Sequence, residues 1–463
     1  MVFDLDFGDI LKENMRYDGE FSDIFAEHTH TSSIVYEENR LEKVISGIDT
    51  GVGIRTIFNK HTAYGYTNDL SKKSLVELAH VVGKASGEGK SIPDIDLRKK
   101  NIDLGFRIKL IPEQVPIEKK VEVVKRANEV AWKYDSRVKQ VKVVYQDRVQ
   151  VITVANSEGI LAEEKRYGIL FAVQVVVAKD DVIQTGYEPV GGFLGFELFE
   201  ENPPEEIAEK AARRAILMLE SPKAPAGKMP VILDSEAGGT MIHEAVGHGL
   251  EADLAQEGLS VYSGKIGEEV ASKLITVIDD ATIPFKRGSY GIDDEGTPSR
   301  RNVLVENGIL KGYLYDRLTA LKDGCESTGN GRRESYRYRP IPRMSNTYIA
   351  PGESNPAAIL KETDRGLFVK KMGGGQVDTV SGNFVFEVSE GYRIENGELG
   401  EPVRGALLTG NGPEVLRIID RVGNDLGFAI GTCGKDGQGV PVSDAQPTLR
   451  IPEIVVGGEN PTE

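Results

Sequence analysis

Two of the six histidines in this 463-residue chain lie close together, with a glutamate directly after the first. They are His243 and His248, in the segment His-Glu-Ala-Val-Gly-His. In a regular α-helix, residues five positions apart lie ~140° apart around the axis, so two imidazoles at this spacing would point in different directions. Both can bind one ion only if the helix deviates between them. We expect a π-type bulge or a helix end near Gly247, because such bulges are frequent at functional sites.

Two imidazoles brought to one face suit zinc, which takes a third protein ligand in catalytic sites and keeps a fourth position open. Cys433 is the better thiol, because it lies in Gly431-Thr432-Cys433-Gly434, whose glycines let the sulfur approach an ion. Cys325 follows a predicted helix end, where the helix dipole disfavours a thiolate, and we interpret it as a structural thiol. Glu244 would then take a proton from zinc-bound water, which predicts metal-assisted hydrolysis of an amide. The alternative is two ordinary histidines on a partly buried helix, beside a solvated Glu244.

Four segments of the chain resemble the TldD branch of the TldD/PmbA metallopeptidase family. They are residues 243–253, Asp-Asp-Glu-Gly-Thr-Pro at 293–298, residues 331–347, and residues 431–435. The resemblance implies a zinc metallopeptidase with metal ligands at His243, His248 and Cys433 and a catalytic carboxylate at Glu244. The PmbA branch, also called TldE, lacks the histidine motif.

The same resemblance implies peptides and unfolded polypeptides as substrates. It also implies a PmbA/TldE-type partner subunit in a heterodimer, with a homodimer as the weaker alternative. A second class of function stays open at this point, which is a non-catalytic regulatory or binding subunit of such a complex. The intact set of His243, Glu244, His248 and Cys433 favours the peptidase.

Five arginines lie within one short segment of this otherwise acidic chain. They are Arg332, Arg333, Arg337, Arg339 and Arg343, interleaved with two tyrosines. Guanidinium groups form forked hydrogen bonds with carboxylates and carbonyls, which makes Arg332, Arg333 and Arg337 candidates for substrate binding. An internal salt-bridge network with the acidic residues at 293–295 is an equal alternative.

His28 and His30 form a second candidate metal pair, because residues two apart on a strand face the same side. No third ligand is evident nearby in the sequence. We therefore favour two ordinary histidines at these positions.

The N-terminal half of the chain alternates strand-like runs with helical ones. Strands separated by turns at Asn39-Arg40 and at 51–53 precede a helix capped by Ser71, and a second helix is predicted over Ile117–Tyr134. Strands over 138–178 are then followed by a helix that begins at Pro204. We predict an N-terminal α+β domain over 1–224, with two similar antiparallel-sheet-plus-helix units at 20–90 and 117–220.

The segment 221–229 contains two prolines and a glycine among charged and small residues, a composition typical of a linker. Beyond it, Asn307-Gly308 and Asn396-Gly397 predict hairpin turns between alternating strands. We therefore predict a second domain over 225–463, glycine-rich and mainly antiparallel β, which carries the metal-binding helix. The fold class is α+β.

The composition is that of an ordinary globular protein, with 40% hydrophobic and 28% charged residues. The net charge of −16 would repel a phosphate backbone, so no nucleic-acid partner is expected. The longest apolar stretch, Ile169 to Ala178, is far shorter than the ~20 residues of a membrane span. An acidic N-terminus without an apolar signal region, together with only two cysteines, predicts a cytoplasmic protein without a disulfide framework.

Overall fold

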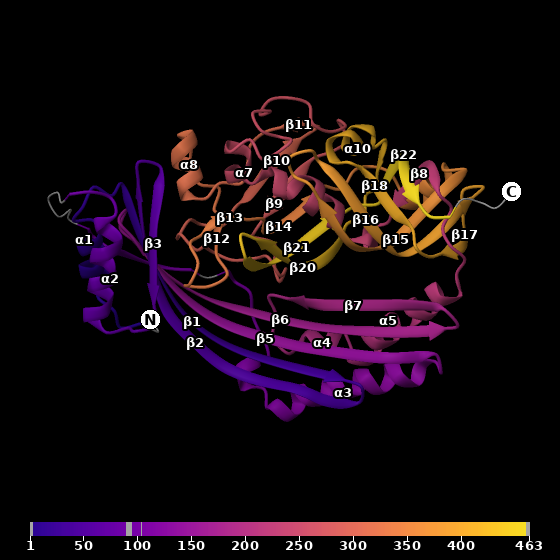
Figure 1. Ribbon diagram of the computed structural model, residues 1–463, viewed down its shortest axis with the longest axis horizontal. Helices are drawn as coiled ribbons and strands as arrows, with labels where there is room; N and C mark the ends of the chain where they lie inside the picture. The colour runs from indigo at the N-terminus through magenta and orange to yellow at the C-terminus, as the bar shows by residue number, and fades with distance from the viewer. Residues whose placement is uncertain (1–2, 89–94, 103, 460–463) are drawn as a thin grey trace.

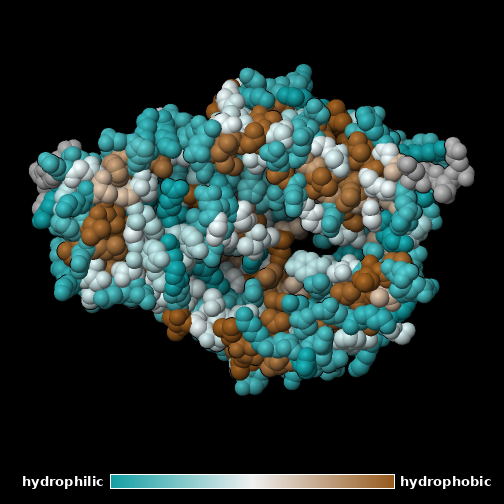
Figure 2. Space-filling model, in the orientation of Figure 1, coloured by the Kyte–Doolittle hydropathy of each residue, from teal (hydrophilic) through white to brown (hydrophobic). Residues whose placement is uncertain are grey.

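The computed structural model describes residues 3–88, 95–102 and 104–459, arranged as two layers (Figure 1). A curved N-terminal sheet, indigo to magenta, lies below a C-terminal domain of smaller sheets, orange to yellow. Figure 2 shows the molecule hollowed between these two layers. The predicted mixed α+β class is confirmed. The last two residues of the predicted first unit, 89 and 90, lie outside the described residues.

The N-terminal sheet is a single seven-stranded sheet, in the order β3-β2-β1-β5-β6-β4, with β7 paired to β6. Its strands are β1 (Phe21–Glu37), β2 (Arg40–Phe58), β3 (His61–Thr67), β4 (Arg98–Asn101), β5 (Val138–Asn156), β6 (Ile160–Lys179) and β7 (Val182–Gly192). The two predicted units do not form separate sheets, because β1 and β5 pair antiparallel from Asp23↔Asn156 to Glu37↔Lys142. Each unit thus supplies a three-stranded meander to one continuous sheet.

Helices cover the outer face and one end of this sheet (Figure 1). They are α1 (Phe7–Asn14), α2 (Lys72–Lys84), α3 (Ile117–Tyr134), α4 (Leu198–Glu201) and α5 (Pro204–Glu220). The predictions for α3 and for the start of α5 are confirmed, and both helices follow a proline that ends the preceding extended segment. Ser71 caps α2 as predicted, since its side chain accepts from the Ser74 amide. The apolar faces of α3 and α5 share one buried cluster with β5 and β6.

The predicted turn at residues 51–53 is wrong, because β2 runs through these positions without a break. The glycines serve close packing instead of a turn. A Cβ at Gly51 would overlap the ring of Tyr336, and a Cβ at Gly53 would overlap the hydroxyl of Tyr64. Tyr336 belongs to the C-terminal domain, so these glycines let the two domains meet.

The C-terminal domain contains two larger sheets and short helices. Its strands are β8 (Gly227–Leu233), β9 (Val277–Asp280), β10 (Arg301–Glu306), β11 (Ile309–Leu310), β12 (Gly331–Arg332), β13 (Ile341–Pro342), β14 (Asn346–Ile349), β15 (Arg365–Val377), β16 (Asn383–Glu395), β17 (Glu398–Val403), β18 (Leu407–Asn411), β19 (Arg421–Val422), β20 (Gly427–Lys435), β21 (Gln438–Gln446) and β22 (Leu449–Gly457). Its helices include α7 (Ala252–Gln256), α8 (Arg317–Asp323), α9 (Pro356–Lys361) and α10 (Gly412–Ile418).

One sheet has the order β11-β10-β9-β14-β21-β20, which leaves β20 at its edge. In the other, β15, β8, β22, β18 and β16 pair in a closed ring, because β15 also pairs with β16. Most pairings are antiparallel, although β14 pairs parallel with β21 and β15 with β8. Positive φ angles at Asn307-Gly308 and Asn396-Gly397 confirm the predicted hairpin turns.

The two layers meet through an apolar cluster and a buried charge network. Phe25, Ile152 and Val154 of the N-terminal sheet pack with Ile292 and Tyr336. Beside them, the Arg55 guanidinium pairs with carboxylates from both layers, at Asp23 and Glu295. Within the described residues, no helix is both long and apolar enough to cross a membrane.

Candidate metal centre

The helical segment that carries the two histidines changes pitch between them, as predicted. A short α-helical turn, α6 (Thr240–Ile242), leads into a π-helical turn over His243–Gly247, and a 3₁₀ turn follows over His248–Leu250. The wider π turn brings the two imidazole rings to a centroid distance of 5.1 Å. A spacing that would separate the rings in an α-helix therefore places them on one face.

Packing in the core holds this turn in place. Ile242 and Val246 are fully buried in the main cluster of the C-terminal domain. A Cβ at Gly247 would overlap the sulfur of the buried Met344, so a larger residue there would have to displace that side chain. The Tyr262 hydroxyl donates to the Ala245 carbonyl at 3.2 Å, which satisfies a backbone group in the widened turn.

Cys433 joins the two histidines from strand β20. Its Sγ lies 3.5 Å from Nε2 of His248, and ligand atoms of His243, His248 and Cys433 all lie within 4.8 Å of one another. The Glu244 side chain is half-buried at the start of the π turn, and it makes no hydrogen bond or ion pair to a described residue. The structure thus brings the three predicted metal ligands together, and Glu244 directly follows the first of them in the chain.

The electrostatics of the cluster favour a metal cation. Burial alone would raise the pKa of Cys433, but hydrogen bonds from His243 and His248 lower that pKa to about 5. The sulfur is therefore a thiolate at neutral pH, which is the form that binds metals. Nδ1 of His243 is buried and has no hydrogen-bond partner among the described residues. Two imidazoles and one thiolate fit the donor set of zinc.

Glu251, which is not among the predicted site residues, orients His248. Nδ1 of His248 lies 3.0 Å from Oε2 of Glu251, which directs Nε2 toward Cys433. Burial opposes the charge of Glu251, but Lys435 and His248 hold its pKa at about 2. Carboxylates commonly orient metal-binding histidines in this way. The signal was present in the sequence, since Glu251 follows His248 at the i+3 spacing that joins neighbours on a helix.

Asp444 has a similar position beside the other histidine. Its Oδ2 lies 3.9 Å from Nδ1 of His243, and its Oδ1 accepts from the Gly239 amide at 3.0 Å. Nothing in the sequence pattern linked Asp444 to the motif, because β21 supplies it.

The arginine segment scatters its side chains. Arg333 joins the buried network, with a nitrogen 3.4 Å from Asp23 and 2.7 Å from the Asp294 carbonyl, which supports the internal alternative for this residue. Arg337 is exposed and pairs with Asp49. Arg332 is buried and donates only to carbonyls. A substrate-binding role for Arg332, Arg333 or Arg337 stays a prediction.

The other candidate residues lie apart from this centre. His28 contacts Thr50 and His30 contacts Ser46, each through one ring nitrogen. Cys325 is exposed just after α8, so it is not a packed core thiol. In the part of the chain that the structure describes, His243, His248 and Cys433 are the only group of three or more such donors close enough to share an ion.

Comparison with protein families matches the chain in three parts. Residues 22–86 match domain 1, 111–219 the central domain and 226–458 the C-terminal domain of the PmbA/TldA metallopeptidases. A metalloprotease TldD homolog of Buchnera aphidicola is 39% identical, covering 94% of this chain and 92% of that protein. A zinc metalloprotease TldD homolog of Saccharolobus solfataricus is 29% identical, covering 97% of this chain and 99% of that protein.

Solved structures show the same fold. A Thermotoga maritima protein described as a modulator of a DNA gyrase has a TM-score of 0.77 at 26% identity, covering 94% of this chain and 96% of its own. TldE from Thermococcus kodakarensis has a TM-score of 0.76 at 20% identity, covering 97% of this chain and 99% of its own. The family matches, the identities and the intact His-Glu-x-x-x-His motif lead to one conclusion: the chain belongs to the PmbA/TldD metallopeptidase family.

Proposed function

We propose that the chain is a zinc-dependent metallopeptidase that hydrolyses peptides and unfolded polypeptides. The observation that carries this proposal is the convergence of His243, His248 and Cys433 on one point, beside a half-buried Glu244. The names of the relatives, which are metalloproteases and a zinc metalloprotease, support the same chemistry.

In the proposed reaction, His243, His248 and Cys433 would hold the metal, and Glu244 would transfer a proton. A zinc ion in such a site polarises a carbonyl and activates water. The Glu244 carboxylate has no hydrogen bond or ion pair within the described residues, so it is available to accept a proton and return it to the leaving amine. Glu251, held by Lys435 at 3.1 Å, keeps His248 in its metal-binding orientation.

The position of Cys433 on an edge strand supports extended substrates. Within the described residues β20 pairs only with β21, so its other edge has no strand partner and can pair with a peptide backbone. A Cβ at Gly434 would meet no atom within 4 Å, which leaves room for a chain beside the cysteine. Binding through the backbone predicts broad sequence specificity. It excludes folded proteins, whose backbone groups are already paired.

We infer that the active form is a heterodimer with a PmbA/TldE-type chain, with a homodimer as the alternative. The outer part of β2, residues 40–48, lies beyond the reach of β3, whose pairing begins at Val52. Four apolar side chains are exposed there, at Leu41, Val44, Ile45 and Ile48. An open strand edge with exposed apolar side chains is typical of a protein–protein interface.

The test compares cleavage of one substrate protein in its native and its permanently unfolded form. The chain is assayed alone and with its co-purified partner, after chelation and again after zinc is restored. We expect cleavage of the unfolded form only, lost on chelation and recovered with zinc. Equal cleavage of the native form, or activity that survives chelation, would contradict the proposal.

A further inference from the structure

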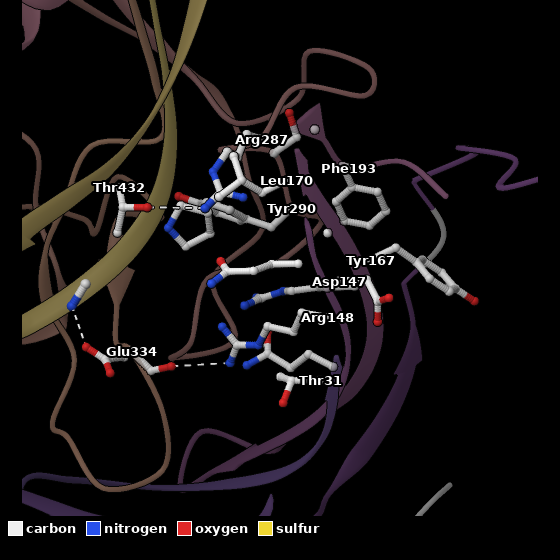
Figure 3. Close-up of a pocket in the computed structure, with 18 of the residues that line it drawn as sticks. Thr31, Asp147, Arg148, Tyr167, Leu170, Phe193, Arg287, Tyr290, Glu334 and Thr432 are labelled. Atoms are coloured by element: carbon white, nitrogen blue, oxygen red, sulfur yellow. Dashed lines mark hydrogen bonds between the residues drawn. The ribbon is translucent and has the colours of Figure 1, made fainter. Parts of the chain in front are cut away.

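A cavity of about 490 Å³ lies between the inner face of the N-terminal sheet and the C-terminal domain. Strands β1, β5 and β6 form one wall, and Thr432 of β20 lies on the other. Figure 3 shows Arg148 on the sheet side, with Arg287, Thr432 and Glu334 around the remaining space. Thr432 directly precedes Cys433, so the cavity adjoins the strand that carries the metal-binding thiolate.

The lining of this cavity has more cationic than anionic side chains, although the chain as a whole has a net charge of −16. Five arginines line it against three acidic residues: Arg148, Arg166, Arg287, Arg332 and Arg333, with Asp147, Asp294 and Glu334. The acidic groups already have partners. Asp147 pairs with Lys120 at 2.6 Å, Asp294 pairs with Arg166 at 2.7 Å, and Glu334 accepts from the Gly439 amide at 2.5 Å.

Two of the arginines have no carboxylate partner among the described residues. Arg332 is only 6% exposed, yet it donates to the carbonyls of Met344 and Pro441 and stacks over Tyr290. Arg287 donates to the Gly431 carbonyl at 3.1 Å and to Oγ1 of Thr432 at 3.2 Å. Buried charges are normally paired, because removing an ion from water is costly.

The pKa values of the Arg287 and Arg332 guanidinium groups are consistent with the lack of a paired carboxylate. Burial, together with the nearby charges of Arg148 and Arg332, lowers the pKa of Arg287 to about 10. Burial also lowers the pKa of Arg332, although the nearby charge of Asp294, which already pairs with Arg166, opposes this shift. By contrast, burial opposes the charge of Arg166 as well, but its acidic partners Glu164 and Asp294 raise its pKa. The cavity thus contains two guanidinium groups that an anion would stabilise.

We propose that Arg287 and Arg332 bind a carboxylate of the peptide substrate in this cavity, an inference that rests on the proposed function. Arg287 is bonded to the two residues that precede Cys433, so a peptide lying along β20 passes directly beside it. Guanidinium forks match carboxylates in geometry and charge. The carboxylate is supplied by the C-terminus of the peptide or by an acidic side chain, since both present the same group.

The test uses four versions of one labelled, unstructured peptide of alternating valine and threonine. The C-terminus is either a free acid or an amide, and one internal position is either glutamate or glutamine. Three of the four versions therefore carry a carboxylate, and the amide with glutamine carries none. The zinc-loaded protein, with its partner, provides kcat/KM, and the Glu244→Gln variant provides Kd by fluorescence anisotropy without turnover.

We expect the version without a carboxylate to show kcat/KM lower, and Kd higher, by at least about tenfold. Comparison of the two versions with a single carboxylate identifies the bound group. If the free-acid peptide with glutamine restores kcat/KM and Kd, the terminus is bound; if the amide peptide with glutamate restores them, the side chain is bound.

Variants of Arg287 and Arg332 test whether the preference for carboxylate-bearing peptides arises in the cavity. Arg287→Gln and Arg332→Gln should each reduce the ratio of kcat/KM between the carboxylate-bearing and carboxylate-free peptides to below about twofold. Arg287 is half-buried, so its variant provides the test even if the Arg332 variant does not fold. Arg126→Gln is the matched control, because Arg126 is exposed and pairs with Glu205 on the far side of the sheet.

These measurements distinguish failure of the proposed peptidase function from failure of carboxylate binding by Arg287 and Arg332. If the wild-type protein hydrolyses no version, the proposed function fails, while anisotropy still reports whether a carboxylate is bound. If all versions are hydrolysed and bound equally, the inference about Arg287 and Arg332 is overturned and the peptidase stands. A preference that survives both arginine variants would also overturn it.

Discussion

The His243–His248 turn and the Arg332–Arg343 segment are both dense in polar side chains, yet their side chains end in very different places. The first brings two imidazoles to one point, where Cys433 meets them. The second sends Arg333 to Asp23 in the buried network and Arg337 to Asp49 at the surface. A helical turn has a defined pitch, so residue spacing within it determines geometry. An irregular segment follows its tertiary contacts instead, and clustering in its sequence says little about clustering in space.

Removal of Cys433, the ligand that comes from a distant part of the chain, should have the largest effect on zinc binding and hydrolysis. We expect Cys433→Ala to reduce bound zinc from about one ion per chain to a small fraction, with loss of hydrolysis, because two imidazoles alone hold zinc weakly. Elemental analysis of purified protein measures the zinc. Cys325→Ala is the matched control, since that thiol is exposed and lies outside the cluster. Zinc retained in full by the Cys433 variant would remove this residue from the site.

Glu244→Gln should keep the metal and lose the reaction. The amide preserves the shape of the side chain but cannot accept the proton, so we expect kcat to fall about 10²- to 10⁴-fold with unchanged zinc content. Glu236→Gln is a suitable control, because Glu236 is an exposed glutamate shortly before the same turn. A decrease in kcat of less than about tenfold would argue against proton transfer by Glu244.

The arginine segment should affect stability according to burial. Arg333→Gln removes a fully buried partner of Asp23, so we expect the free energy of unfolding to fall by about 3 kcal/mol. Arg337→Gln breaks a pair whose side chains are 43% and 47% exposed, and we expect a change below about 1 kcal/mol. Urea denaturation of both variants measures the difference. Similar losses for the two would show that the segment acts as one unit.

A smaller loss of zinc binding than that of Cys433→Ala is expected at Glu251, the residue that orients His248. Glu251→Gln keeps a hydrogen-bond acceptor but removes the charge, and we expect zinc affinity to fall about 10- to 100-fold. Competition with a chelator of known affinity measures this change. Asp253→Asn is the matched control, because Asp253 also pairs with Lys435 but has no hydrogen bond or ion pair to His248 among the described residues. An equal loss of affinity in both variants would assign the effect to Lys435.

Features with local causes were predictable from the sequence. The bounds of α3 follow from Pro116 and a regular apolar pattern, and the π turn follows from the five-residue histidine spacing. The choice of Cys433 over Cys325 depended on flanking glycines and a helix end, both of which are local signals.

Features that depend on distant contacts were not predictable in the same way. Gly51 and Gly53 indicated a turn, but they accommodate Tyr336 and Tyr64, and the sequence does not show that Tyr336 packs there. The pairing of β1 with β5, which merges the two units into one sheet, is likewise a tertiary event. The cavity beside β20 forms where the two layers meet. No sequence motif therefore predicted that Arg287 and Arg332 would lack a carboxylate partner.

The most direct test of the metal centre is X-ray absorption at the zinc edge on the purified protein, compared with the Cys433→Ala variant. The structure predicts one sulfur ligand at about 2.3 Å and nitrogen ligands at about 2.0 Å in the wild-type protein, with the sulfur absent from any zinc left in the variant. A wild-type spectrum with only nitrogen and oxygen ligands would contradict the site formed by His243, His248 and Cys433.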